Sequence, residues 1–360
     1  MSEKTSSVHY INYLSLDKVL NSQNLVSKEK GGEAHEEMLF IIIHQTYELW
    51  FKQILHELDS AMVLFKADKI DESNIGVIVG RMDRVNKIMT TLVGQLDILE
   101  TMTSLDFLDF RDHLSPASGF QSHQFRKLEV MLGLKIEKRH QPGGCPYHAQ
   151  FEGEKKEEIL NLEENESLFS LVEKWLERIP FLTMQDFDFT KKYESAVNEM
   201  LKKEIEGIKG ASLTEEDRML RVRMIDENRK YFDRVLSEEQ HNKAIAEGET
   251  KLSYKATMSA LLINLYRDQP ILHLPYQFLR SLVELDHKIA TWRFRHVQMV
   301  EKMLGQKIGT GGSSGQEYLK KTVDKHKLFT DFANIATLMI SRSYLPELPQ
   351  NIKDTLGFNY

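Results

Sequence analysis

The sequence predicts an all-α protein built as one large helical bundle, because three features of the chain point to helices. The chain has 360 residues but only eight prolines. Apolar residues recur at spacings of three and four along long stretches, which is the period of a helix with one buried face. Charged residues make up 28% of the chain and fill the positions between them. No stretch has the composition of a linker, so we expect a single domain over residues 1–360.

Three segments carry the helical period most strongly and are predicted to form the long helices of the bundle. They span residues 36–65, 71–100 and 274–304. Pro116 and Pro275 are predicted to mark helix boundaries, because proline lacks the backbone N–H that a helix interior needs. In the first segment the apolar stripe consists of Phe40, Tyr47, Phe51, Leu55, Leu58 and Met62.

The middle of the chain is more polar than the rest. Residues 163–250 are highly charged and are predicted to form an excursion of charged helices. Within it, Thr214 and Asp217 have the spacing of a capping box at the start of an amphipathic helix. Residues 136–156, "IEKRHQPGGCPYHAQFEGEKK", cluster glycine and proline and are predicted to be the main loop of the chain.

Composition and charge exclude several classes of protein. A formal net charge of −7 without a basic block argues against binding to nucleic acid or to an anionic membrane. A single cysteine, Cys145, excludes an internal disulfide framework and suits a reducing compartment. The polar start lacks the apolar core of a signal peptide, and the longest apolar run, 38–43, is too short to span a bilayer. We therefore expect a cytoplasmic protein.

A glycine-rich stretch, "IGTGGSSGQEYL" at 308–319, raises the possibility of a phosphate-binding loop. The dinucleotide fingerprint counted from Gly309 requires a third glycine where Ser314 stands, and no Lys-Ser or Lys-Thr follows Gly315. The segment before the loop reads as a long helix rather than a strand. Spacing and context both exclude nucleotide binding, so the loop serves another purpose.

His44 lies in an unusually apolar segment, "FIIIHQTYELWFKQ", one helical turn after Phe40 and on the same face. A histidine among Ile, Phe, Tyr and Trp either bonds within the core or faces a cavity. Taken alone, the first interpretation is favoured, because buried polar groups usually find partners.

Arg111 stands in "TSLDFLDFRDHLSPASGFQS", four residues after Phe107 and on the same face. A guanidinium flanked by aromatic rings can hold a carboxylate through a forked pair of hydrogen bonds. The alternative is a surface arginine paired with Asp109 or Asp112. The small residues of "SPASGF" that follow favour a ligand site, because they allow the backbone to approach a ligand closely.

His296 projects from an apolar helical stripe in "WRFRHVQMVEKMLG". Such a stripe is more often plain core than part of a cofactor site. One neutral histidine on such a wall is nevertheless what a haem iron requires as its proximal ligand, with a partner for the second ring nitrogen. The stripe consists of Ile289, Trp292, Met299 and Met303.

Two other groups of residues could bind a metal. A di-iron carboxylate bundle uses two Glu-x-x-His pairs, and this chain has them at Glu284–His287 and Glu238–His241. A chain with thirteen histidines produces such matches by chance, and the second pair lies in a polar context. Cys145 with His148 forms only a lone pair of ligands in a Gly-Pro loop, which is usually just a loop.

Five segments in a fixed order resemble the tryptophan 2,3-dioxygenase family, and the resemblance covers nearly the whole chain. "SPASGFQS" and "GTGGSSG" are its most specific motifs. The resemblance is weakest in residues 136–165 and 185–250. The matching segments are "YINYLSLDKVL" (10–20), "HEEMLFIIIHQTYELWFKQILHELDS" (35–60), "LETMTSLDFLDFRDHLSPASGFQSHQFRKLE" (99–129), "WRFRHVQMVEKMLG" (292–305) and "GTGGSSGQEYL" (309–319).

The resemblance implies a large helical bundle that encloses a haem pocket. It implies haem b, ferrous in the active form, which inserts both atoms of O₂ across the indole C2–C3 bond of L-tryptophan. The expected product is N-formyl-L-kynurenine, in the first step of tryptophan degradation by the kynurenine pathway. The protein would position the cofactor and the substrate, exclude water from the pocket and balance the charges of the ligands.

The resemblance also implies the role of individual residues. His296 would be the proximal iron ligand, with Trp292 and Gly119 beside the cofactor, and His44 the distal, catalytic histidine near the indole N–H. The glycines around Thr310 would let the backbone fold over the ligands and exclude water. The implied substrate-binding residues are Phe40, Ile41, Ile42, Ile43, His44, Phe107, Arg111, Ser118 and Thr310.

The family resemblance further implies a homotetramer in which residues 1–25 are exchanged with a neighbouring subunit. Tyr10 and Tyr13 would then lie near the neighbour's substrate. The alternative for this segment is an ordinary amphipathic helix packed on its own subunit. One departure from animal relatives is Ile43, which stands where a threonine is common and changes the hydrogen bonding beside His44.

Two alternative functions belong to other classes. The first is a non-catalytic haem or amino-acid sensor on the same fold, which would not need to retain both the arginine clamp and the two histidines. The second is a di-iron carboxylate oxidase, which would contain two non-haem irons per chain and show no Soret band.

Overall fold

The computed structural model describes residues 8–67, 72–136, 139, 146–184, 187–305, 307 and 315–357. Within these residues the protein is almost entirely helical, which confirms the all-α prediction. Its only regular strands there are β1 (Thr183–Met184) and β2 (Phe187–Asp188), which pair antiparallel.

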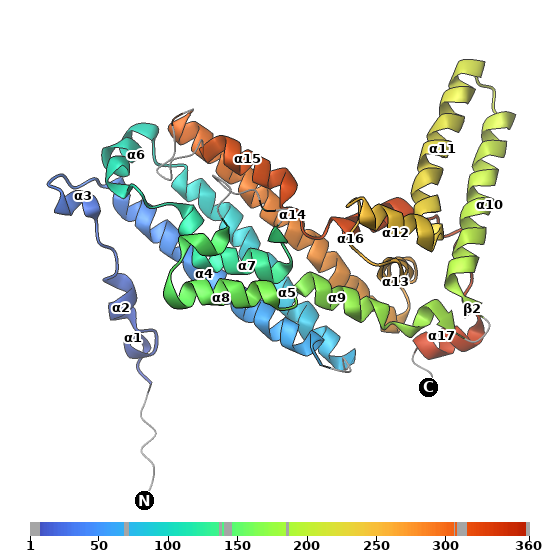
Figure 1. Ribbon diagram of the computed structural model, residues 1–360, viewed down its shortest axis with the longest axis horizontal. Helices are drawn as coiled ribbons and strands as arrows, with labels where there is room; N and C mark the ends of the chain where they lie inside the picture. The colour runs from blue at the N-terminus through green and yellow to red at the C-terminus, as the bar shows by residue number, and fades with distance from the viewer. Residues whose placement is uncertain are drawn as a thin grey trace, which may run out of the picture.

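Three long helices form the centre of the molecule: α4 (Glu36–Phe65), α5 (Glu72–Leu99) and α14 (Pro270–Leu304). Helix α5 packs against both of the others, and the three run side by side through the body of the protein (Figure 1). The predicted stripe of α4 points into this core, where Phe51 is 4% and Leu58 0% exposed. Two of the three long helices therefore match their predicted bounds within one residue.

The prediction for α14 was wrong at its start. The helix begins at Pro270 rather than near Leu274, and Pro275 lies inside it instead of at its boundary. Pro270 occupies the first helical position, where its missing N–H would have no partner in any case. Pro275 is still close enough to this end that the helix continues through it.

Shorter helices cover one end of the long helices. Thr103 caps α6 (Ser104–Arg111), the first of these helices, through a reciprocal pair of hydrogen bonds with Asp106. Helix α7 (His123–Leu132) packs on α4, and α15 (Gly315–Lys325) packs on α14. In chain order these elements are α6 (Ser104–Arg111), η1 (Asp112–Leu114), η2 (Gly119–Gln121), α7 (His123–Leu132) and α15 (Gly315–Lys325).

The predicted 136–156 loop is partly helical where it is described. The short helix η5 (Tyr147–Gln150) and the start of α8 (Gly153–Glu164) lie in it, and both pack near α7. Cys145 lies outside the described residues.

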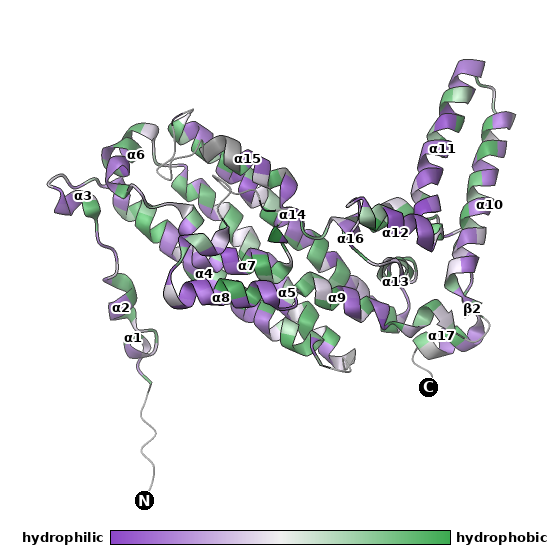
Figure 2. Ribbon diagram, in the orientation of Figure 1, coloured by the Kyte–Doolittle hydropathy of each residue, from purple (hydrophilic) through white to green (hydrophobic). Residues whose placement is uncertain are grey.

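At the other end of the molecule, α10 (Phe189–Gly210) and α11 (Glu215–Leu236) form an antiparallel pair that projects from the body (Figure 1). Both helices carry many hydrophilic residues (Figure 2). Thr214 caps α11 by accepting a bond from the backbone N–H of Asp217 at 3.1 Å. The predicted charged excursion also contains α9 (Leu168–Glu177), which is a core helix with Leu168 and Val172 fully buried.

The remaining helices fill the space between the projecting pair and the long helices. Several of them pack against α13, whose side chains are almost all buried. They are η6 (Pro180–Leu182), α12 (Glu238–Ala246), α13 (Tyr254–Leu265), α16 (Thr330–Asn334), η7 (Ile335–Leu338) and α17 (Gln350–Leu356).

The N-terminal segment lies apart from the body (Figure 1). It contains α1 (Tyr10–Tyr13), α2 (Leu16–Leu20) and α3 (Val26–Glu29). The buried carboxylate of Glu37 accepts the backbone N–H groups of Val26 and Ser27, each at 3.0 Å, and so fixes α3 to the start of α4. No side chain of α1 or α2 is buried. Among the helices described, none combines the length and apolar composition needed to cross a membrane.

Candidate active site

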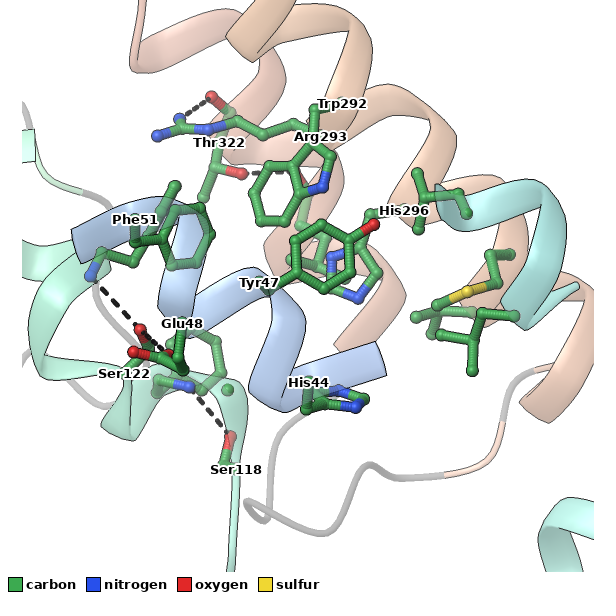
Figure 3. A pocket seen from close by; sticks show the side chains of 18 of the residues that line it. His44, Tyr47, Glu48, Phe51, Ser118, Ser122, Trp292, Arg293, His296 and Thr322 are labelled. Carbon is green, nitrogen blue, oxygen red and sulfur yellow. Dashed lines mark hydrogen bonds between the residues drawn. The ribbon is translucent and has the colours of Figure 1, made fainter. Parts of the chain in front are cut away.

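A cavity of about 280 Å³ lies between the long helices α4 and α14 and the shorter helices α6, α7 and α15. Most of its surface is apolar. Phe51, Phe125 and Trp292 form an aromatic wall, in which the ring of Trp292 lies 5.2 Å from that of Phe125 and 6.2 Å from that of Phe51. Both histidines singled out in the sequence, His44 and His296, line the same cavity from opposite helices (Figure 3).

His296 enters the cavity from α14. Burial, together with a smaller contribution from the nearby His44, lowers the pKa of its imidazole to about 4. The ring stacks at 5.7 Å on that of Trp292, one turn earlier on the helix. Within the described part of the chain, neither ring nitrogen has a hydrogen-bond partner. The result is a neutral imidazole whose lone pair is available to a ligand in the cavity.

His44 enters from α4. Its Nδ1 lies 2.7 Å from the carbonyl oxygen of Phe40. Because a carbonyl oxygen can only accept, Nδ1–H must be the donor, and in the neutral ring Nε2 then carries the lone pair. Burial lowers the pKa of His44, which favours this neutral form, although the ring is still accessible through the mouth of the cavity. His44 can therefore accept a hydrogen bond at Nε2.

Aromatic rings from α4 and α6 surround His44. The ring of Phe40 lies 4.1 Å from that of His44 and 5.7 Å from that of Phe107. Phe107 lines the cavity, whereas Phe40 does not. Ile43 is 4% exposed and belongs to the core. Ile41, Ile42 and Ile43 were predicted to contact the substrate, but their side chains do not line the cavity.

Arg111 is the last residue of α6 and lines the cavity. Its side chain is 16% exposed, and its closest approach to Asp112 is 3.9 Å, longer than a hydrogen bond. The side chain therefore reaches the cavity that Phe107 also lines. Ser118 and Gly119 line the cavity from the loop that follows.

A buried charged cluster forms the inner wall and was not predicted. Burial alone would raise the pKa of Glu129, but the guanidiniums of Arg126 and Arg293 hold it well below its usual range. Arg126 donates to Glu129 at 2.6 Å, and Arg293 donates to the other carboxylate oxygen at 2.5 Å. His326 lies 3.2 Å from the same carboxylate, and Arg293 also donates to the backbone oxygen of Thr322 at 2.9 Å.

The cavity lining described here carries an excess of positive charge. It contains three guanidiniums, from Arg111, Arg126 and Arg293, and two carboxylates, from Glu48 and Glu129. Buried charges are stable only when they are compensated. Within this lining, Glu129 already compensates Arg126 and Arg293 through direct hydrogen bonds.

Several predicted residues lie elsewhere. Thr310 lies outside the described residues. Tyr10 and Tyr13 are 69% and 75% exposed and do not line the cavity of their own chain. Trp292 and Gly119 do line it, as the cofactor prediction requires.

One residue from each Glu-x-x-His pair of the di-iron alternative is engaged in a structural contact. His241 is buried, and its Nε2–H donates to the backbone oxygen of Leu252 at 2.9 Å. Glu284 pairs with Lys288 at 2.7 Å. In the described ranges, no three His, Cys, Asp or Glu side chains are arranged to hold a metal ion.

Comparison with known proteins identifies the family. A family model described as tryptophan 2,3-dioxygenase matches residues 1–339. The tryptophan 2,3-dioxygenase of Bdellovibrio bacteriovorus is 48% identical over 98% of this chain and 99% of its own length. That of Dictyostelium discoideum is 46% identical over 98% of this chain and 88% of its own. That of Mus musculus is 44% identical over 94% of this chain and 84% of its own. Because the similarity extends along nearly the entire sequence, this chain belongs to the tryptophan 2,3-dioxygenase family.

Proposed function

We propose that the chain performs the tryptophan dioxygenase reaction with a haem whose iron is held by His296. The observation that carries the proposal is the neutral imidazole of His296, which lines the cavity opposite His44 and has no hydrogen-bond partner in the described part of the chain. An imidazole that faces an apolar cavity with neither nitrogen hydrogen-bonded is suited to ligate a metal.

The rest of the lining fits a haem b group. The walls beside His296 are apolar and aromatic, which suits a porphyrin. When bound, ferrous haem supplies the oxygen chemistry, which no side chain of the protein can supply.

The protein residues bind and orient the substrate. Arg111 is proposed to hold the carboxylate of L-tryptophan, and Phe107 to pack beside its indole ring. His44 would accept the indole N–H at Nε2, because its Nδ1–H is already committed to the carbonyl of Phe40. A low pKa keeps His44 neutral, so that it can accept this bond near neutral pH. Ser118 would contribute a further polar contact at the mouth of the cavity.

The apolar walls give these residues a second task, which is to exclude water. With O₂ bound beside the indole ring, a dry cavity strengthens the orienting hydrogen bonds and protects reactive species from water. The proposed product is N-formyl-L-kynurenine. Thr310, in the glycine-rich loop, is proposed to contact the amino-acid end of the substrate.

We also propose that the active form is a cytoplasmic homotetramer in which the N-terminal segment covers a neighbour's cavity. The support is the exposure of apolar residues on a segment that packs little on its own chain, Tyr10 and Tyr13 among them. Exposed apolar residues gathered on one segment are typical of a surface covered by a partner.

The test is a spectroscopic and activity assay on the purified protein. The purified protein should show a Soret band. After anaerobic reduction and addition of L-tryptophan in air, the absorbance of N-formylkynurenine should appear. Intact haem with tryptophan binding but no product would favour the sensor. Two non-haem irons per chain without a Soret band would favour the di-iron oxidase.

A further inference from the structure

The loop between α6 and α7 carries Ser118 and Gly119 and lies at the surface of the cavity. No residue of η1 or η2 within it is buried. Its internal bonds are local, such as the reciprocal cap in which the backbone N–H of Ser118 donates to Gln121 at 3.3 Å. Contacts with neighbouring elements therefore help to hold the loop in position, and η1 already packs on α3.

Glu48, on α4, supplies a further attachment. Ser122, at the end of the loop, donates from its hydroxyl to the carboxylate of Glu48 at 2.5 Å. The side-chain amide of Gln124 donates to the other carboxylate oxygen at 2.9 Å and to the backbone oxygen of Glu48 at 2.7 Å. The Ser122 hydroxyl also accepts the backbone N–H of Phe125 at 3.2 Å, which caps α7.

Glu48 lies beside His44, so its bonds to Ser122 and Gln124 affect the cavity directly. Glu48 follows His44 by one helical turn, so both side chains lie on the same face of α4 and both line the cavity. Figure 3 shows Glu48 and Ser122 together at one side of the cavity, with His44 and Ser118 on either side of its lower part. The carboxylate thus connects the wall that carries His44 to the loop that carries Ser118.

We propose that Glu48 is a positioning residue for tryptophan binding, which acts by holding the loop at a fixed distance from His44. The inference deepens the proposed function and rests on it. Without the attachment, the loop must be ordered each time the substrate binds, so part of the binding free energy is lost in the ground state and the transition state alike. Such a loss raises KM and leaves kcat nearly unchanged.

The central experiment compares Glu48→Ala with Glu48→Gln in the full-length holoenzyme. Hydrogen bonds to a charged group are worth about 1.5–3 kcal/mol, so we expect Glu48→Ala to raise the KM for L-tryptophan about 10- to 100-fold, with kcat changed less than about threefold. Glutamine keeps an oxygen that accepts from Ser122, so Glu48→Gln should restore most of the affinity. Haem content and the Soret band should stay at the wild-type level in both variants.

Ser122→Ala removes the attachment from the loop side. We expect its KM to rise as well, and the double variant with Glu48→Ala to be little worse than either single variant, because both changes break the same contact. The matched control is Asp59→Ala, which removes an exposed carboxylate from the same helix and should leave KM unchanged.

Each other result has a distinct meaning. Equal defects in Glu48→Gln and Glu48→Ala would overturn the proposal, because the charge beside His44 and not the attachment would then matter. A fall in kcat at unchanged KM, or additive effects of the two sites, would overturn it as well. Loss of haem or of the folded state in all three variants would reduce Glu48 to a structural contact. A wild-type protein without turnover would instead contradict the proposed function.

Discussion

At the scale of single residues, the cavity is defined by which atoms are already committed. His44 gives its Nδ1 proton to a helix carbonyl, which leaves one acceptor nitrogen for the indole N–H. His296 commits neither nitrogen within the described part of the chain, which is what an iron ligand requires. The two histidines have the same chemistry and receive different roles from their surroundings.

Replacing His296 tests the iron-ligand assignment. We expect His296→Ala to lose haem or to hold it loosely, because His44 enters the cavity from a different helix and His326 is bonded to Glu129. Absorption spectra and haem content per chain measure this, with His287→Ala on the same helix as the control. Normal haem content and activity in His296→Ala would exclude the assignment.

Replacing Arg111 tests the carboxylate clamp. Because bonds between charged groups are worth about 1.5–3 kcal/mol, Arg111→Ala should raise the KM for tryptophan about 10- to 100-fold. Steady-state kinetics measure the change, and tryptamine, which lacks the carboxylate, should lose much less than tryptophan. An unchanged KM would assign the carboxylate to another group.

Among these residues, Glu129 is expected to contribute most to the stability of the folded protein. Glu129→Gln would leave two buried guanidiniums without their carboxylate, which costs about 3–5 kcal/mol. The low folded-state pKa of Glu129 fixes the sign of the pH dependence. Its stabilisation is complete above the ordinary pKa of a glutamate and is lost as the pH falls through the folded pKa.

Denaturant unfolding at several pH values measures this prediction. The stability difference between wild type and Glu129→Gln should be largest near neutral pH and should shrink in acid. A constant difference across that range would mean that the carboxylate charge does not stabilise the cluster.

At the scale of elements, the helices were predictable and their mutual contacts were not. The period of apolar residues gave α4 its bounds, because the face of one helix is written in the local sequence. The start of α14 was missed because a proline was interpreted as a boundary. His44, Arg111 and His296 were found from local context and from the family resemblance.

The inner wall could not be found in the same way. Glu129, Arg293 and His326 come from α7, α14 and the end of α15, and their pairing depends on how these helices pack. A charged residue in a helix is ordinarily exposed, so nothing in the local sequence marks these three as buried. Glu48 was missed for a related reason, since its partners follow about 75 residues later.

Thr214 provides a test of a single element. Thr214→Ala removes the cap of α11 and should cost about 1 kcal/mol, felt mainly in the projecting pair of helices. Hydrogen exchange should rise in the first turns of α11, while the KM for tryptophan stays unchanged because the cavity lies at the other end of the molecule. A change confined to KM would contradict this view of the two ends.

At the scale of the whole molecule, the accessible cavity and the exposed N-terminal segment are two surfaces that a partner could cover. The long helices build three sides of the cavity, and its mouth is left accessible at His44. The segment before α3 exposes Tyr10 and Tyr13 and finds little to pack against on its own chain. In the proposed homotetramer, a neighbouring subunit would cover both surfaces.

Deleting residues 1–20 tests this arrangement. If the segment completes a neighbour's cavity, the deletion should raise the KM for tryptophan and weaken assembly, while haem binding by His296 persists. Kinetics and sedimentation of the full-length and shortened proteins measure both effects. Wild-type kinetics in the shortened protein would place the segment outside the substrate site.

The anchor that Glu37 provides for α3 has one more consequence. Because the segment leaves the body from a fixed point, its reach is limited. In the proposed homotetramer, the neighbour's cavity would have to lie within that reach. Specific activity would then fall on dilution, as mass action separates the subunits and uncovers their catalytic chambers. The concentration of the enzyme itself would become a control on tryptophan breakdown.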